Sequence, residues 1–223
     1  KGGGRGFTCD RLIYDEAITG GRYQEGFTYG NSPGPTLVPE SPLPHLTVVS
    51  KGLANGMPLA AVVGDADLMA CFDADFHPAW ADTVHGLETA RGPVYCSGTW
   101  SAPALSLAAA SATLRVWERE KVAKRLWEIG TALRSALYSV ADGGATMDGG
   151  ARLRLRGQPY RWALETIAPS GTMDYVALTL LRQYLVDEGV LTGPGFNICL
   201  AHGDAGVLRR ATQPGLLVCL PGQ

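Results

Sequence analysis

The sequence predicts an α/β protein with an open sheet in its first half and a separate α+β unit in its second half. Short apolar runs in the first half end in polar residues, as Leu46–Val49 ends at Ser50 and Lys51. Ligands of open α/β sheets bind outside the carboxyl ends of the strands, so this pattern is typical of that class. From about residue 118, amphipathic helical segments flank one alternating polar–apolar segment, which is typical of α+β units. We therefore predict domains over 1–117 and 118–223.

The composition excludes several function classes for this 223-residue chain. Its formal net charge is −2 and its Lys and Arg residues form no basic run, which gives no electrostatic case for nucleic acid or anionic membranes. No stretch is long enough to span a bilayer. An odd number of widely spaced cysteines without a CxxC predicts reduced thiols in a cytoplasmic protein and no metal site. The five cysteines are Cys9, Cys71, Cys96, Cys199 and Cys219.

The first half contains strand-like runs separated by turn-forming residues. We expect three buried strands, a short helix and a further strand ending in Ser97-Gly98-Thr99. A Pro/Gly-rich stretch, 26–45, predicts an irregular excursion between the first two strands. The first predicted strand falls in 11–21, where Asp15 marks its end, and the next two fall in Leu46–Val49 and Leu59–Val63. The short helix falls in 65–72 and the further strand in 94–100.

The second half predicts helices around an exposed strand or hairpin. The first half ends in a predicted helix that runs to about Trp117. Ser101 is a candidate cap for this helix, and Pro103 suits its first turn. A second helix follows, with apolar residues at helical spacing and basic residues on its other face. Its apolar positions are Val122, Leu126, Ile129, Leu133 and Leu137. Three further elements complete the unit: the alternating segment 151–165, a helix over 174–188 closed by Gly189, and a strand within 190–201.

Asp15, Lys51 and the Ser97-Gly98-Thr99 turn are each weak signals alone. A strand-terminal Asp is usually a turn former, a single Lys is usually a solvated surface group, and such a turn is usually only a turn. Together they match the needs of pyridoxal phosphate. That cofactor needs a lysine amine for its aldehyde, a carboxylate for its pyridine nitrogen, and hydroxyl or backbone N–H donors for its phosphate.

The motifs that contain these residues resemble those of class III aminotransferases, in particular the glutamate-1-semialdehyde aminomutase branch. They are "LIYDEAITGGR", "LTVVSKGLANGMPLAAVVG" and "YCSGTWSAPALSLAAASATL", and the resemblance continues to "YLVDEGVLTGPGFNICLAHGDAGVLRRAT". It implies fold type I of the pyridoxal-phosphate enzymes, with part of the mixed, mostly parallel sheet of the large domain and a small C-terminal domain. It also implies a homodimer that acts on a small amino donor and a keto or aldehyde acceptor.

Carried over residue by residue, the resemblance assigns four positions. Lys51 matches the Schiff-base lysine, Asp15 the acid that faces the pyridine nitrogen, and Thr99 the threonine that reaches the phosphate in the neighbouring subunit's site. Glu16 matches the adjacent acid, for which we expect a structural role. Three features depart from the pattern: Ala17 replaces a Val or Ile, the loop before Lys51 is longer and carries His45 for an Asp, and the family's N-terminal half has no counterpart.

These departures leave three interpretations open. The first is amino-group transfer, by an aminotransferase or aminomutase, in a chain truncated at its N-terminus. The second is a non-catalytic remnant with a structural or regulatory role, which the missing half and Ala17 favour. The third is another pyridoxal-phosphate reaction on the same scaffold, such as decarboxylation or racemisation.

Overall fold

The structure is a computed structural model that describes residues 11–23, 43–73, 94, 98–141, 149–193 and 195–204. Its internal contacts divide the chain into two units, Lys1–Lys121 and Val122–Gln223. The sequence places the boundary between residues 117 and 118, four residues earlier.

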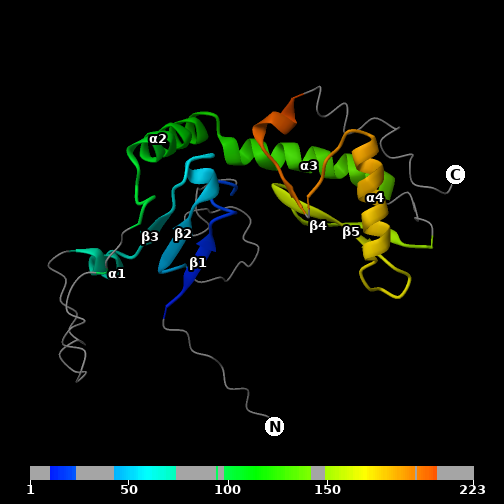
Figure 1. Cartoon of the computed structure of the whole chain (residues 1–223), viewed down its shortest axis with the longest axis horizontal. Helices are drawn as coiled ribbons and strands as arrows, with labels where there is room; N and C mark the ends of the chain where they lie inside the picture. Colours follow the sequence, from blue (N-terminus) through cyan, green and yellow to red (C-terminus); the bar gives the residue numbers. More distant parts are fainter. Residues whose placement is uncertain are drawn as a thin grey trace, which may run out of the picture. The chain divides into compact units, whose positions relative to one another are not determined.

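The first unit contains a three-stranded mixed sheet in the order β1-β2-β3 (Figure 1). Strands β1 (Ile13–Glu16) and β2 (Leu46–Val49) are parallel, and Asp15 pairs with Val48. Strand β3 (Ala61–Gly64) runs antiparallel to β2. Because β1 and β2 are parallel, their carboxyl ends meet at one edge of the sheet.

Short helical segments connect and cover this sheet. The 3₁₀ turn η2 (Lys51–Leu53) follows β2, and α1 (Ala66–Met69) with η3 (Ala70–Phe72) follows β3, as the sequence predicts for 65–72. Helix α2 (Ala104–Arg119) lies against η2. The core of the unit is small and joins β2, η2 and α2. Its buried members are Val49, Leu53, Ala54 and Ala110.

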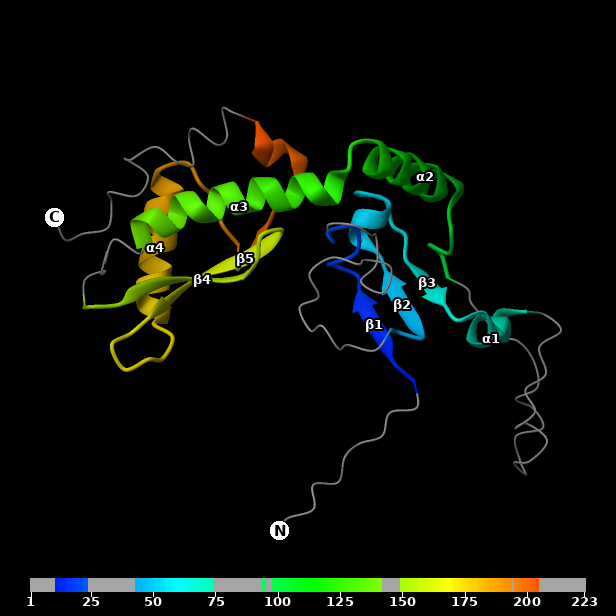
Figure 2. The same cartoon turned by 180° about the vertical axis from the view of Figure 1, so that it is seen from behind.

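The second unit combines an antiparallel sheet with two helices (Figure 2). Helix α3 (Val122–Ala141) precedes the hairpin of β4 (Arg152–Gln158) and β5 (Arg161–Ile167), and β6 (Phe196–Asn197) pairs with β5. The helix and the hairpin confirm the sequence prediction.

Helix α4 (Tyr175–Asp187) covers the apolar face of the hairpin. Asp174 caps it by accepting the Ala177 N–H at 2.9 Å, and Gly189 closes it with a φ of 78°. The 3₁₀ turn η6 (Leu200–Gly203) packs on α3. The buried cluster between α4 and the hairpin consists of Ala151, Ala177, Leu181 and Leu185, with Leu153, Leu164 and Val190 against it.

Several local predictions are wrong. Strand β1 is not fully buried, because Ile13 is 58% exposed. Strand β3 is not buried either: Val62 is 39% and Val63 45% exposed, because β3 is the last strand of the described sheet and lacks a neighbour there. Ser101 does not cap α2, because Pro103 occupies the N-cap position and no side chain caps it.

The strand expected within 190–201 is reduced to the two residues of β6. Trp162 stacks on Phe196 with ring centroids 4.3 Å apart, and the pairing of β5 with β6 ends at these two residues. Of the strand expected in 94–100, residues 95–97 lie outside the described residues, and Thr99 and Trp100 form a turn.

His45 ties together the starts of β1 and β2 and the end of β3. Its Nδ1 accepts the Leu12 N–H at 2.9 Å, its own backbone N–H donates to Leu12 O at 2.8 Å, and its carbonyl accepts the Asp65 N–H at 2.8 Å.

His45→Ala removes the side-chain acceptor and should lower the free energy of unfolding of the first unit by about 1 kcal/mol. Hydrogen exchange of the Leu12 amide should accelerate accordingly. His45→Asn, whose Oδ1 can replace Nδ1, should restore protection, and equal exchange in both variants would contradict this role.

Gly130 allows α3 to contact the turn of the hairpin. A Cβ atom at this buried position would overlap the carbonyl oxygen of Pro159. Alanine normally stabilises a helix interior relative to glycine, but overpacking costs about 1–3 kcal/mol. Gly130→Ala should therefore lower the urea midpoint of the second unit. The control is Thr131→Ala at the exposed neighbouring position, which should leave the midpoint unchanged or raise it. A Gly130→Ala protein as stable as this control would refute the close contact.

Candidate functional site

The parallel pairing of β1 and β2 brings two of the predicted site residues to one edge of the sheet. Asp15 is the third residue of β1 and pairs with Val48, and Lys51 follows two residues beyond the end of β2. Both residues are exposed. The edge formed by the carboxyl ends of these strands is where open α/β sheets bind ligands.

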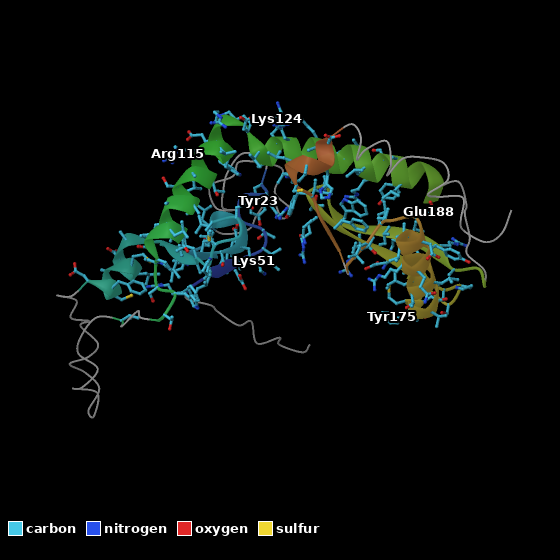
Figure 3. The ribbon with its side chains drawn as sticks, turned by 45° about the horizontal axis from the view of Figure 1, so that its top comes forward. Tyr23, Lys51, Arg115, Lys124, Tyr175 and Glu188 are labelled. Carbon is cyan, nitrogen blue, oxygen red and sulfur yellow. The ribbon has the colours of Figure 1, made fainter. Side chains whose placement is uncertain are left out.

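Lys51 combines an exposed side chain with a fixed backbone. Figure 3 labels it in the first unit, at the turn η2. Its φ is 41°, a left-handed conformation that is uncommon for a residue with a side chain. The next residues enter the core, because Leu53 and Ala54 are 8% and 3% exposed. The exposed lysine therefore stands on a turn whose apolar side is buried.

Asp15 and Glu16 point to opposite faces of the sheet, as successive residues of a strand must. Asp15 is exposed, and its Oδ1 accepts the Ala17 N–H at 3.0 Å. Glu16 is only 2% exposed, which agrees with the structural role expected for it. The carboxylate of Asp15 is a turn former here, but one bond leaves most of its acceptor capacity for a further donor.

Thr99 lies in the exposed turn that precedes α2. The Gly98 carbonyl of this turn accepts the Ser101 N–H at 3.0 Å, and Ser97 lies outside the described residues. Helix α2 itself is tied to the end of β1, because Trp117 Nε1 donates to Gly21 O at 2.7 Å. The structure thus places Thr99 in the same unit as Asp15 and Lys51.

Two residues near the site carry interactions that sequence reasoning missed. Ser50 Oγ donates to Leu59 O at 2.9 Å across the bend that contains Lys51, and Trp117 fixes α2 against the turn after β1. A hydroxyl directly before the lysine and an indole N–H near the end of α2 are the only signals in the sequence, and neither identifies its acceptor.

The part of the chain that the structure describes contains no candidate metal site and no candidate membrane-spanning helix. No group of three or more His, Cys, Asp or Glu residues within it could hold a metal ion. None of its helices has the length and apolar character needed to cross a membrane. Cys199 and His202 form a pair, with Sγ 3.3 Å from Nδ1, and they cap η6.

These residues fit the chemistry of pyridoxal phosphate. The exposed carboxylate of Asp15 lies near the end of β1 and the exposed amine of Lys51 follows β2, its parallel neighbour, so an aldehyde-bearing ring could meet both from the solvent side of one edge. The turn after β1 lies beside the bend that contains Lys51, because a Cβ atom on Gly52 would be in ordinary contact, at 3.7 Å, with Gly20 O. The donor set is that of an aldehyde cofactor and not that of a metal.

Similar proteins in sequence are aminomutases. The chain is 28% identical over 194 residues to glutamate-1-semialdehyde 2,1-aminomutase of Opitutus terrae, which covers 86% of this chain and 37% of that protein. It is 32% identical over 131 residues to the aminomutase of Desulfitobacterium hafniense, which covers 59% and 25%. The matches therefore span between a quarter and little more than a third of the length of these curated relatives.

Similar solved structures are aminotransferases and related proteins. The β-phenylalanine aminotransferase of Variovorax paradoxus matches 90% of this chain and 42% of its own, with a TM-score of 0.66 and 23% identity. The internal aldimine form of the FumI protein of a Sphingopyxis species, which contains pyridoxal phosphate, matches 91% and 41%, with a TM-score of 0.63 and 20% identity. These matches show the fold, which is a part of fold type I of the pyridoxal-phosphate-dependent transferases.

The family assignment rests on the chain's own sequence. The sequence profile of the family Aminotransferase class-III matches residues 11–194, which include Asp15, Lys51 and Thr99. Family and fold both support pyridoxal phosphate as the cofactor. The chain belongs to the class III aminotransferase family.

Proposed function

We propose that this chain takes part in pyridoxal-phosphate-dependent amino-group transfer, as an aminotransferase or a glutamate-1-semialdehyde aminomutase-like enzyme. The observation that carries the proposal is the pairing of β1 with β2, which sets Asp15 and Lys51 at the carboxyl ends of adjacent parallel strands. Membership of the class III family supports it, and the aminomutase relatives favour that branch. In this proposal residues 1–117 belong to the cofactor-binding domain and 118–223 to the small domain.

Two residues of the first unit would hold and use the cofactor. Pyridoxal phosphate, when bound, supplies an aldehyde and a protonated ring that accepts an electron pair from the substrate. Lys51 Nζ would hold the aldehyde carbon, with loss of water, and, once displaced by the amino substrate, would move a proton to or from the substrate carbon. Asp15 would accept a hydrogen bond from the ring N–H and so keep that nitrogen protonated.

The proposal also includes partners. The substrates are a small amino donor and a keto or aldehyde acceptor; in an aminomutase one molecule serves as both. Thr99, in the exposed turn before α2, is the proposed donor to the phosphate in a second copy's site, which makes the protein a homodimer.

The test is a cofactor titration followed by substrate addition. Pyridoxal phosphate is added to the protein, and the visible absorption of the bound cofactor is recorded. The proposal predicts a long-wavelength band that shifts when an amino donor from a panel that includes glutamate 1-semialdehyde is added. No band in the unmutated protein would refute cofactor binding. A band that no donor shifts would favour a non-catalytic remnant. A donor that loses CO₂ or is racemised would identify another reaction on this scaffold.

A further inference from the structure

Ser50 closes the bend that presents Lys51. Its Oγ donates to the carbonyl of Leu59 at 2.9 Å, between residues nine positions apart, in a partly buried setting. Ser50 lies one residue after β2, and Leu59 lies two residues before β3. The bond therefore joins the two ends of the connection that contains Lys51.

The backbone around Lys51 is held at several points. Leu53 N–H donates to Ser50 O at 2.9 Å, and Asn55 N–H donates to Lys51 O at 3.2 Å. Buried Val49 precedes the bend and buried Leu53 lies within it. Ser50 supplies the one side-chain bond that spans this connection among the described residues.

The conformation of Lys51 requires such support. A positive φ is unfavourable for a residue with a Cβ atom, and it persists only where the surrounding structure imposes it. The side chain of Lys51 is exposed, so packing constrains its direction less than it would constrain that of a buried side chain. The direction in which its Cα–Cβ bond points is therefore set by the backbone bonds and by the Ser50 bond.

We propose that Ser50 is a positioning residue for Lys51: its hydrogen bond to Leu59 O holds the bend in the conformation that aims the Lys51 amine at the cofactor aldehyde. This inference rests on the proposed function of Lys51. Without the Ser50 hydroxyl, Leu59 O loses its partner and the Lys51 backbone can relax to the more common negative φ. The amine then spends less time where the aldehyde carbon can reach it.

The chain contains its own internal controls for this role. It has four lysines, Lys1, Lys51, Lys121 and Lys124. Lys121 is also exposed and also has a positive φ, of 49°. Pyridoxal phosphate is added to the full chain, borohydride reduces the C=N bonds formed with loss of water, and peptide mass spectrometry gives the ratio of label at Lys51 to label at Lys121 and Lys124.

Four variants test the role of the hydroxyl. Ser50→Ala should lower the labelling ratio about five-fold, the factor that one net hydrogen bond represents. Ser50→Thr keeps the hydroxyl and should restore the ratio to within about two-fold, because a β-branched residue suits the extended backbone of Ser50. Ser50→Cys has a side chain of similar size with a weaker donor and should give an intermediate labelling ratio. This variant keeps the role of the hydroxyl testable if Ser50→Ala does not fold. The matched control is Ser111→Ala, which removes an exposed serine bonded to Arg115 at 2.8 Å and should change nothing.

The outcomes separate this inference from the proposed function. Preferential labelling of Lys51 that persists unchanged in Ser50→Ala would overturn the positioning role and leave the function of Lys51 intact. No preference for Lys51 in the unmutated chain would overturn both. A fall in Ser50→Ala that Ser50→Thr fails to restore would show that general loosening of the fold, and not the hydroxyl, is responsible.

Discussion

Lys51→Ala should reduce the covalent attachment of pyridoxal phosphate to the background of the other lysines and leave amino-group transfer lower by about 10²–10⁴-fold, the usual contribution of a proton-transfer group. Two functions are lost with one side chain: the amine that bonds the aldehyde, and the base that moves the substrate proton. The fold should be unaffected, because the Lys51 side chain is exposed and takes no part in the core. Residual non-covalent binding through the ring and phosphate contacts should remain.

The measurement pairs borohydride trapping with turnover of the amino donor identified by the titration. Lys121→Ala is the matched control, because it removes another exposed lysine with a positive φ at the end of the first unit. It should leave both trapping and turnover unchanged. Trapping in Lys51→Ala that equals the trapping in the control, or turnover that stays near that of the control, would remove Lys51 from its proposed role.

The sequence was sufficient to predict the elements that depend on local pattern. The spacing of Leu126 and Leu133 identified α3, Asp174 and Gly189 identified the ends of α4, and alternation identified the β4–β5 hairpin. The strand ends at Asp15 and Lys51 were predictable for the same reason, since a short apolar run followed by polar residues indicates where a strand stops. Because β1 and β2 are parallel neighbours, those two ends become one edge.

Features that depend on long-range contacts could not be predicted. An apolar run such as that of β3 looks the same at the centre of a sheet and at its edge, so the exposure of Val63 is invisible to pattern. Ser101 has the chemistry of a cap, but the chain enters α2 through Pro103, so no side-chain oxygen caps the helix. The bond from Ser50 to Leu59 depends on how the bend closes, which composition does not specify.

Asp15 offers the sharpest distinction between a structural and a functional carboxylate. Its observed bond to Ala17 N–H is that of an ordinary turn former, and an uncharged amide can accept that bond equally well. Asp15→Asn should therefore keep the turn and the stability of the first unit. The bond to a protonated ring nitrogen depends on charge, and charge-assisted bonds are worth about 1.5–3 kcal/mol. Turnover in Asp15→Asn should accordingly fall about 10–100-fold, with labelling of Lys51 retained.

A matched control exists for the turn itself. Asp65 Oδ1 accepts the N–H two residues ahead at 3.0 Å, the same geometry as Asp15 and Ala17, at the start of α1. Asp65→Ala should lower stability slightly and leave turnover unchanged, whereas Asp15→Ala should lower both. If Asp15→Asn turns over at nearly the unmutated rate, Asp15 is only a turn former and the ring nitrogen has another partner. If Asp15→Asn loses turnover while its unfolding curve matches that of the unmutated protein, the negative charge, and not the turn, is what the reaction requires.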